Sequence, residues 1–327
     1  MDLQNELTKR AEVFNTYWQQ YLAIKKPTKL YEASQHLPAA GGKRIRPFLT
    51  LTCCESVSGD PTKALPLAAG LELIHNFTLV HDDIMDHSLL RRNLPAVHIK
   101  FGEPAAILAG DLLFAKAFES LLKTSVDFQT YKLLQYDFID GIIAICEGQQ
   151  LDMEFESRKT VTEQEYLDMI GKKTGALFEL AGKGGAMIGG GTPPEVAALK
   201  TYGMTLGLAF QIWDDYLDMS STATTLGKDI GNDIRNGKKT LIAVHSLTHA
   251  TGQNKKHLDE VFGNHAASED DVALVYDLFR DLGSIEYAQN RALALVNQAK
   301  DALKILKPSD AKELLYQLIE YTIQREK

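Results

Sequence analysis

Two acidic clusters of identical spacing are the residues of this sequence best able to do chemistry. The first is Asp82-Asp83-Ile84-Met85-Asp86 and the second is Asp214-Asp215-Tyr216-Leu217-Asp218. Each closes an apolar run of helical character, so the outer aspartates of a cluster should lie about one turn apart on one helix face. Carboxylates held that close repel each other unless a cation lies between them, and carboxylate oxygens are ligands that suit Mg²⁺.

The repetition of the motif decides between two interpretations. A single acidic cluster is most often the solvated end of a helix, because charged side chains are seldom buried without partners. Two clusters of the same spacing, each beside a hydrophobic run that should lie inside the protein, favour a shared metal site instead. We predict that Mg²⁺ is bound by the outer carboxylates, which are Asp82, Asp86, Asp214 and Asp218.

Basic residues accompany these clusters at positions where helices begin or end. Such residues can bind a diphosphate directly, because Arg grips phosphate oxygens with two N–H groups and Lys acts as a point charge. Backbone N–H groups in the flexible pair Gly41-Gly42 can assist. The candidates are Lys43, Arg44, Arg46, Arg91, Arg92, Lys172, Lys173, Lys228, Lys238 and Lys239. Acidic and basic sets together indicate one diphosphate bound through metal and another bound directly.

The composition is that of an ordinary globular protein, with 45% hydrophobic and 24% charged residues in a chain of 327, which is long enough to bury a sizeable core. A net charge of -8 argues against general nucleic-acid binding. The three cysteines have no metal-ligand spacing and predict a reduced, cytoplasmic protein. The N-terminus has no signal-peptide pattern, and no run approaches the roughly 18 apolar residues of a membrane span.

The elements that must position these groups are all predicted to be helices. Helical patterns cover residues 2–25, 48–57, 60–86, 103–124 and 127–155, and they resume near 239, after 268, from 284 to 306 and after 309. Capping boxes at 162–165 and 192–195 open two further helices, with glycines 182–191 ending the first. Residues 89–102 and 220–237 are predicted loops, the second with a helical turn at 229–234. No stretch alternates with period two for long enough to indicate a strand, so we predict one all-α domain over residues 1–327.

The motifs, taken in order, resemble those of the E-type (trans) polyprenyl diphosphate synthases, which condense isopentenyl diphosphate with an allylic diphosphate. The matching segments are 41–47, 73–75, 79–86, 91–92, 148–152, 173–174, 210–218, 227–229 and 233–240. This resemblance implies an isoprenoid synthase-type helical bundle around a central cavity, present as a homodimer. One departure is Asn93, which replaces the glycine usually found after the arginine pair and leaves the conformation of that loop open.

The resemblance also implies a role for each matched side chain. Mg²⁺ on the allylic diphosphate would be held by Asp82 and Asp86, and a further Mg²⁺ chiefly by Asp214, for three ions per active site. The same leaving diphosphate would be neutralised by Arg91, Lys173 and Lys228. Isopentenyl diphosphate would bind to Lys43, Arg46, His75 and Arg92, with Lys238 as a further substrate-binding group. Thr174 and Gln211 would lie beside the allylic carbon, so the predicted catalytic groups are Asp82, Lys173, Thr174, Gln211 and Asp214.

Product length is predicted from side chains one to two turns before Asp82. Thr78 lies about 6 Å below Asp82 on nearly the same face, and the ring of Phe77 beside it would form the floor of the cavity. An aromatic residue five positions before an uninterrupted motif resembles the short-chain geranylgeranyl diphosphate synthases. We therefore predict geranylgeranyl diphosphate as the product, with farnesyl or longer chains as alternatives.

Two other classes of protein compete with this reading. A terpenoid cyclase or head-to-head synthase also uses acidic metal motifs, but it does not need the basic groups for a second diphosphate. A non-catalytic partner subunit would keep the fold and lose motif residues, whereas the acidic motifs and the basic positions are intact here. A zinc site at His81 and His87 is disfavoured because no Cys/His ligand spacing surrounds them.

Overall fold

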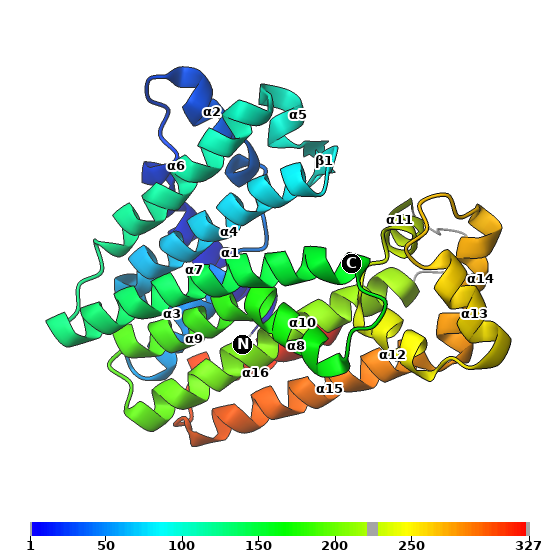
Figure 1. Cartoon of the computed structure of the whole chain (residues 1–327). Coiled ribbons are helices and arrows are strands. Elements are labelled where there is room, and N and C mark those ends of the chain that lie inside the picture. The colour runs from blue at the N-terminus through cyan, green and yellow to red at the C-terminus, as the bar shows by residue number, and fades with distance from the viewer. Residues whose placement is uncertain (1, 221–227, 325–327) are drawn as a thin grey trace. The chain divides into compact units, whose positions relative to one another are not determined.

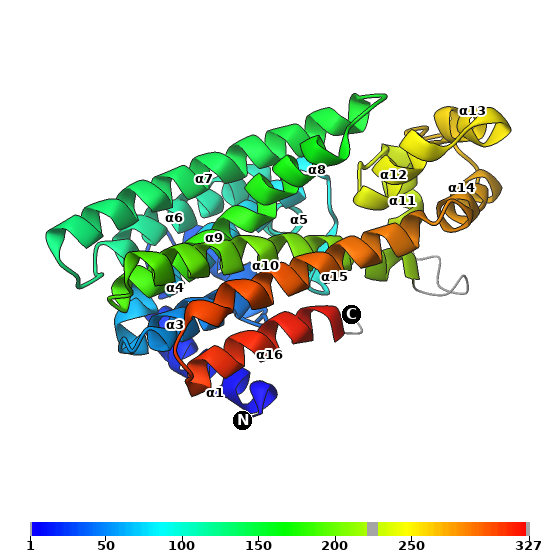
Figure 2. The ribbon, with the colours of Figure 1, turned by 90° about the horizontal axis from the view of Figure 1, so that it is seen from below.

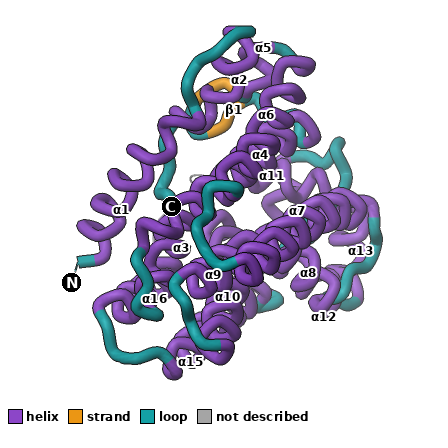
Figure 3. Tube along the Cα trace, turned by 90° about the vertical axis from the view of Figure 1, so that its left-hand side faces the viewer, coloured by secondary structure: helices purple, strands orange, loops and turns teal. Residues whose placement is uncertain are grey.

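The computed structural model describes residues 2–220 and 228–324, and its regular elements are helices apart from one short hairpin, shown in orange in Figure 3. The first helices, labelled in Figure 1, are α1 (Leu3–Trp18), α2 (Thr28–Ala39), α3 (Ile45–Ser56), α4 (Leu65–Met85), α5 (Val97–Phe101), α6 (Glu103–Leu121) and α7 (Phe128–Ser157). The middle of the chain forms α8 (Glu163–Ile170), a π-helical segment (Gly171–Gly175), α9 (Ala176–Ile188) and α10 (Pro193–Ser220). The remainder forms α11 (Lys228–Asn236), α12 (Leu241–His249), α13 (Gly252–Val261), α14 (Glu269–Asp281), α15 (Ser284–Ala302) and α16 (Asp310–Gln324).

The all-α prediction is confirmed, and the capping boxes begin helices where expected. The Thr162 hydroxyl accepts from the Glu165 N–H, and Glu165 accepts from Thr162 in return. At the start of α10, the Thr192 N–H and hydroxyl both donate to Glu195. None of the helices in the described residues is long and apolar enough to cross a membrane.

One expectation about local structure was wrong. The loop predicted over 89–102 contains a hairpin, β1 (Leu90–Arg91) and β2 (Leu94–Pro95), followed by the short helix α5. The glycine-rich segment 182–191 does end a helix, but α9 passes through Gly184 and Gly185 and ends only at Ile188. Helices α2 and α13 were not predicted; α13 has a weak apolar face, with only Leu258 and Val261 buried.

Contacts between residues divide the chain into two compact units. Unit 1 comprises Met1–Ile139, Leu180–Lys200 and Leu303–Gln317, and unit 2 comprises Asp140–Glu179, Thr201–Ala302 and Leu318–Lys327. Several long helices, among them α7 and α10, contribute residues to both units. The first acidic motif belongs to unit 1 and the second to unit 2.

Unit 1 is built on the packing of α4 along α6, which run side by side in Figure 1. Two glycines allow the helices to come close. A Cβ on Gly70 of α4 would lie 3.3 Å from the carbonyl oxygen of Ala117, and a Cβ on Gly110 of α6 would lie 2.2 Å from Nε2 of His81. The last turn of α4, which carries the first acidic motif, is therefore fixed against α6.

A buried ion pair joins the start of α3 to the middle of α4. Arg44 Nη1 donates to Glu72 Oε1 at 2.7 Å, and the two side chains are 6% and 4% exposed. Its other nitrogens donate to the Pro38 carbonyl at 3.1 Å and to Asn15 Oδ1 at 3.2 Å. Arg44 was grouped with the diphosphate-binding cations from sequence, but its donors are used inside the protein and link α1, α2, α3 and α4.

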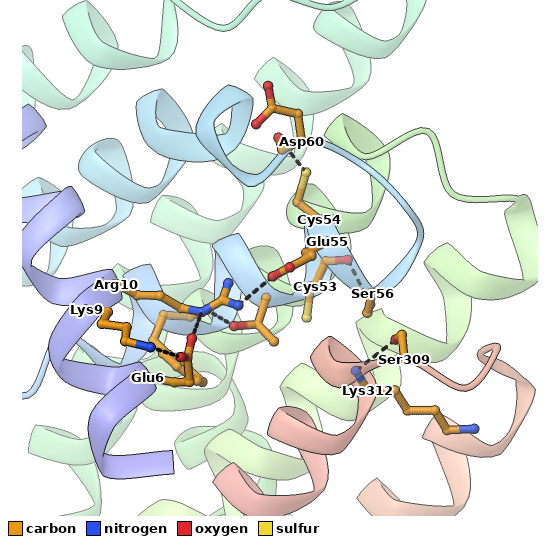
Figure 4. Close-up of polar contacts among 12 residues, drawn as sticks. Glu6, Lys9, Arg10, Cys53, Cys54, Glu55, Ser56, Asp60, Ser309 and Lys312 are labelled. Carbon is orange, nitrogen blue, oxygen red and sulfur yellow. Dashed lines mark hydrogen bonds and ion pairs between the residues drawn. The ribbon is translucent and has the colours of Figure 1, made fainter. Parts of the chain in front are cut away.

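The outer helix α1 is attached to α3 by charged side chains, as Figure 4 shows. Arg10 Nη2 contacts Glu55 at 2.5 Å, and its Nε lies 3.7 Å from Glu6 on the same helix. Nearby, the Cys54 thiol donates to the Asp60 carbonyl at 3.3 Å. Asp60 caps the 3₁₀ turn Pro61–Ala64 that leads into α4, so the expected helix start at this residue is a short turn followed by the main helix.

Unit 2 brings together the helices α11 to α14, which are labelled in Figure 2. Helix α12 packs on α8, α14 and α15. Glu163, at the first turn of α8, accepts from Tyr287 at 2.5 Å and from Arg291 at 2.8 Å, both on α15. These contacts hold α8 and the π-helical segment that continues it.

The hairpin resolves the question raised by Asn93. Leu90 pairs with Pro95 and Arg91 with Leu94, which leaves Arg92 and Asn93 as a two-residue turn. Both have positive φ, 53° and 60°, as the two central residues of a type I′ turn require. Asn is one of the few residues other than Gly that adopt this conformation readily, so it can serve in place of the usual glycine.

Candidate active site

The first acidic motif separates its three aspartates by environment. Asp82 is half-buried and Asp86, which ends α4, is exposed. Asp83 between them has a side chain only 1% exposed, and Arg91 of β1 contacts its Oδ1 through Nε at 2.8 Å and Nη2 at 2.6 Å. Burial raises the pKa of Asp83, and the Arg91 contact opposes that rise. The outer aspartates are therefore accessible, while the middle one anchors the hairpin to α4.

The second motif repeats this arrangement in unit 2. Asp214 is half-buried, Asp218 is exposed, and Asp215 is 9% exposed. The Tyr166 hydroxyl donates to Asp215 Oδ2 at 3.0 Å, and Gln211 Nε2 donates to Oδ1 at 3.1 Å. Burial raises the pKa of Asp215 to about 7, although Lys238 and these two donors lower it. Here too the middle aspartate is an internal acceptor.

The accessible carboxylates suit a metal ion that arrives with its substrate. Within residues 2–220 and 228–324, no three His, Cys, Asp or Glu side chains converge to form a complete metal site. Mg²⁺ usually keeps several waters and is bound by one or two carboxylates plus substrate phosphate oxygens. The pairs Asp82/Asp86 and Asp214/Asp218 are accessible and one turn apart, so they fit that mode of binding.

A cluster of cations lies beside the first motif in unit 1. Burial lowers the pKa of Arg46 to about 10; Glu72 opposes this change and Arg92 adds to it. The pKa of Arg92 is also lowered by burial and by Arg44 and Arg91, against the effect of Glu72. Positive charges that depress one another's pKa form a favourable place for an anion.

The glycine pair before α3 shapes one side of this cluster. Gly41 and Gly42 have φ of 88° and 153°, a conformation that L-residues rarely adopt. The Arg92 guanidinium donates to the Gly41 carbonyl and, at 3.4 Å, to that of Leu37. The hairpin is thereby tied to the loop that presents the exposed Lys43.

His75 is held uncharged within the same cluster. Burial is the largest cause that lowers its pKa well below the usual value, and Arg46, Arg92, Arg91 and Arg44 lower it further. A neutral imidazole has one N–H donor and one acceptor, so it can hydrogen-bond a phosphate without adding charge. Lys43, Arg46, His75 and Arg92, which were expected to bind one diphosphate, thus belong to one region of unit 1.

In unit 2, the π-helical segment Gly171–Gly175 carries Lys173 and Thr174. Such segments occur often at functional sites because they interrupt the regular helical pattern. Neighbouring glycines make room for it: a Cβ on Gly148 would lie 2.3 Å from the Lys173 nitrogen, and one on Gly207 would lie 2.9 Å from the Gly175 Cα. Helices α7 and α10 therefore contact the segment through their backbones.

Side chains around this segment form two polar contacts of importance. Lys173 Nζ lies 2.5 Å from Asp152 of α7. The Thr174 hydroxyl donates to Gln211 Oε1 at 3.0 Å, which completes a hydrogen-bonded series from Thr174 through Gln211 and Asp215 to Tyr166. Thr174 and Gln211, predicted to lie together, do so.

Lys238 lies among carboxylates at the end of α11. Its Nζ is 3.6 Å from Asp233 Oδ2. Burial lowers its pKa, but Asp233, Asp215, Asp152 and Asp218 outweigh burial and raise the pKa above the usual value. The ammonium group remains charged and compensates acidic residues of the second motif.

Lys228 and Lys172 were also predicted as candidates for binding diphosphate. Lys228 begins α11, but its side chain lies outside the described residues. Lys172 forms an ion pair of 2.6 Å with Glu147, and both side chains are well exposed, so it contributes a surface contact.

Three residues that position other side chains were not predicted from the sequence. Asp152 positions Lys173, and Tyr166 positions Asp215. Asp233 does the same for Lys238. Asp152 lies in the matched segment 148–152, which was a signal that went unused. Tyr166 had none, because a tyrosine on an amphipathic helix usually belongs to the core.

The predicted chain-length residues lie on α4 before the first motif. The Phe77 ring contacts His81 at a centroid distance of 4.8 Å and Phe114 of α6 at 5.3 Å. Phe114 in turn contacts Phe118 at 5.2 Å, and Phe118 contacts Phe138 at 5.4 Å. Thr78 is half-buried and donates to the His75 carbonyl at 2.9 Å. Phe77 is thus the first in a row of aromatic rings in unit 1, each in contact with the next.

A mainly helical protein with two accessible carboxylate pairs and a cluster of arginines around His75 has the groups of an enzyme that handles diphosphates. Comparison with known proteins agrees. The Polyprenyl synthetase family model matches residues 27–279. A short chain isoprenyl diphosphate synthase of Methanothermobacter thermautotrophicus is 46% identical over 326 residues, covering 100% of this chain and 99% of the relative.

Two other relatives give the same result. A geranylgeranyl diphosphate synthase of Methanosarcina mazei is 40% identical and covers 100% of this chain and 99% of its own. The crystal structure of a geranylgeranyl pyrophosphate synthetase from Pyrococcus horikoshii superposes with a TM-score of 0.94 at 42% identity, covering 99% and 98% of the two chains. The chain belongs to the polyprenyl synthetase family and is a prenyltransferase of the all-α isoprenoid synthase fold.

The neutral state of His75 predicts a pH dependence of stability. Because the folded-state pKa lies below the unfolded value of about 6.5, the unfolded chain binds more protons as the pH falls below that value. This group's contribution to stability is present above pH 6.5 and is lost at lower pH, by at most about 1.4 kcal/mol per pH unit. In urea titrations at pH 7.5 and 5.5, the His75→Gln variant should lose less free energy of unfolding than the wild type.

The matched control is His265→Gln, which removes an exposed histidine. Equal losses in the wild type and in His75→Gln would show that His75 does not titrate in this way.

Proposed function

We propose that this prenyltransferase condenses isopentenyl diphosphate with an allylic diphosphate and releases geranylgeranyl diphosphate. The observation that carries the proposal is the presence of both accessible carboxylate pairs and a separate basic cluster around His75. The first suits a diphosphate bound through metal and the second suits one bound directly. The names of the relatives described above support the same reaction and a short product.

The reaction breaks the bond between the allylic carbon and its diphosphate, which leaves with the electron pair. The double bond of isopentenyl diphosphate then attacks the allylic cation, and a proton is lost to restore a double bond. We assign this proton to the departed diphosphate, because none of the described residues around the acidic motifs is assigned the role of a base. A single side-chain base whose removal abolished turnover would contradict that assignment.

The metal ligands in this proposal are Asp82 and Asp86 for one part of the site and Asp214 with Asp218 for the other, with three Mg²⁺ ions in total. When bound, Mg²⁺ neutralises charge on the leaving diphosphate. Arg91, Lys173, Lys228 and Lys238 are the protein cations assigned to substrate phosphates on that side. Arg91 contacts Asp83, and Lys173 contacts Asp152. These carboxylates orient the two cations, whose N–H groups would then donate to substrate oxygens as well.

Thr174 and Gln211 are assigned to the allylic carbon. The Thr174 hydroxyl uses its hydrogen to donate to Gln211 Oε1, so it presents oxygen lone pairs to any neighbouring group. Gln211 is oriented by its donation to Asp215. Oxygen dipoles held in this way stabilise a developing carbocation without reacting with it.

The direct test is turnover. Purified protein incubated with isopentenyl diphosphate and dimethylallyl, geranyl or farnesyl diphosphate should elongate the primer only when Mg²⁺ is present. Chromatography of the dephosphorylated products should give mainly the geranylgeranyl chain. Asp82→Ala and Asp214→Ala should each lower kcat by about 10²-fold or more, because each removes charge stabilisation of the transition state.

The control is Glu12→Ala, an exposed carboxylate on α1, which should keep wild-type activity. A folded protein that elongates no primer would instead support the partner-subunit or cyclase alternative.

Product length is proposed to depend on Phe77, with Thr78 on the same helix. Removing the ring would leave Phe114, Phe118 and Phe138 as the next rings in the row. Phe77→Ala should therefore release products one or more isoprene units longer than the wild type, as measured by chromatographic sizing.

Phe128→Ala provides the comparison, because that ring is 73% exposed at the start of α7. An unchanged product length in Phe77→Ala would remove Phe77 as the floor.

We also propose that the chain forms a homodimer. Helices α6 and α7 expose large apolar side chains, among them Ile107, Leu108, Leu133, Tyr136 and Ile139, which are 42% to 57% exposed. Apolar surface of this kind often marks a protein interface. The free cysteines Cys53, Cys54 and Cys146 fit a cytoplasmic location, where thiols remain reduced.

Sedimentation velocity should give twice the chain mass of 36.3 kDa. Leu133→Lys should shift the protein toward the monomer, because it places a charge on the apolar face of α7. Ile305→Lys, at another apolar side chain that is 53% exposed, should not. A wild-type protein that sediments as a monomer at micromolar concentration would contradict the proposal.

A further inference from the structure

Unit 2 contains a polar cavity that none of the roles described above uses. It has a volume of about 530 Å³ and lies among the end of α7, the following loop, α12 and α13. That volume is within the range of small-molecule sites. Its walls include the cationic residues Arg158, Lys159, Lys239 and Lys255, the acidic residues Glu156 and Asp259, and the apolar residues Leu258 and Phe262.

The buried member of this set is Lys239, which is 4% exposed. Its ammonium donates to the carbonyl oxygens of Gly237 at 2.8 Å and Glu156 at 3.3 Å and lies 5.0 Å from the centroid of the Phe262 ring. In the part of the chain that the structure describes, no carboxylate forms an ion pair with it. One of its three N–H donors thus remains for a ligand in the cavity.

Burying an ammonium group without a carboxylate partner costs free energy and makes the group easier to deprotonate. Burial lowers the pKa of Lys239 to about 8, and Arg158 lowers it further, while Glu156 opposes the change. An anion in the cavity would remove this penalty.

The cations on the rim differ in how far they are already neutralised. Arg158 contacts Glu165 at 2.7 Å, and Lys255 contacts Asp259 at 2.8 Å. Lys159 is exposed and makes no hydrogen bond or ion pair with any described residue. Lys159 and Lys239 are therefore the two cations whose charge is available to a ligand.

We propose that this cavity is a second ligand site, distinct from the acidic motifs, that binds a phosphate or diphosphate headgroup on Lys239 and Lys159. A tetrahedral phosphate presents oxygens in several directions and so can meet cations that project from different walls, which a planar carboxylate does less well. An apolar body attached to the headgroup would rest on Leu258 and Phe262. The ligand class is a small phosphorylated molecule, and the site does not depend on the reaction proposed above.

The site is placed to influence Lys238. Lys238 and Lys239 are adjacent, and the first reaches the carboxylates near the second motif while the second reaches the cavity. Gly237 before them has φ of 70°. A Cβ there would lie 3.1 Å from both the backbone carbonyl oxygen of Glu156 and the Cα of Gly263. A ligand on Lys239 would therefore stabilise the backbone that presents Lys238.

The test is site-resolved labelling of amines at pH 8 in metal-free buffer, read by mass spectrometry of the Lys239 peptide. The probe is inorganic diphosphate. An anion beside Lys239 raises the pKa of the ammonium by about one unit or more, so the reactive unprotonated fraction should fall by up to about tenfold at saturation. Lys9, whose side chain is 59% exposed, should label at the same rate throughout.

The variant Lys159→Ala identifies the location of the bound diphosphate, because it removes a side chain that makes no hydrogen bond or ion pair with any described residue. It should raise the diphosphate concentration for half-protection about twofold to fivefold, as expected for one exposed charge. An unchanged protection curve would mean that diphosphate acts from elsewhere and would overturn the proposal. So would labelling of Lys239 that diphosphate does not slow.

Two other probes define the ligand. If geranyl diphosphate protects Lys239 from labelling at a lower concentration than inorganic diphosphate, its apolar body contacts Leu258 and Phe262. Equal protection by the two compounds would support binding by the headgroup alone. Citrate that protects as well as diphosphate would refute the phosphate chemistry. In calorimetric titration without metal, Lys239→Met should lack one class of diphosphate site that the wild type has.

Discussion

The buried carboxylate at the centre of each acidic motif is the interaction on which the rest of the site depends. Successive residues of a helix point about 100° apart, so the outer aspartates share a face that the middle one cannot share. Asp83 is held by Arg91, and Asp215 by Tyr166 and Gln211. Because burying a carboxylate away from such donors is costly, these partners fix the rotation of α4 and α10 and keep the outer carboxylates accessible.

Pairing with buried partners also distinguishes basic residues that are close together in the sequence. Arg44 is buried against Glu72, whereas Arg46, two residues later, belongs to the cluster around His75. Lys238 reaches carboxylates, whereas Lys239 reaches two carbonyl oxygens beside a different cavity. Arg44 is consumed by the fold, and the two lysines face different neighbours although they are adjacent in sequence. Charge alone therefore does not identify a binding residue.

Much of the fold could be predicted from sequence because its signals are local. Capping boxes begin α8 and α10, and apolar periodicity marks the long helices. The spacing of the acidic motifs also predicted which aspartates share a face. The turn at Arg92-Asn93 could not be predicted, because it depends on two successive residues of positive φ, neither of which is glycine.

Other features were beyond the sequence because they arise from contacts between distant segments. The π-helical segment Gly171–Gly175 follows α8 without any change of composition. The role of Tyr166 appears only when α8 and α10 lie together. Arg44 and Arg46 are indistinguishable by type, and only the location of Glu72 decides which one is buried.

The glycines that surround the π-helical segment limit how this region of the protein can vary. At Gly148 and Gly207 the nearest atoms are backbone, and even a methyl group would meet them at under 3.0 Å. A side chain can rotate away from a new neighbour, but backbone packed on backbone has no such freedom. Exchange of a catalytic side chain can thus leave the fold intact, whereas the smallest enlargement at these glycines requires whole helices to separate. Evolutionary change around Lys173 and Thr174 is therefore constrained first by the clearance between main chains.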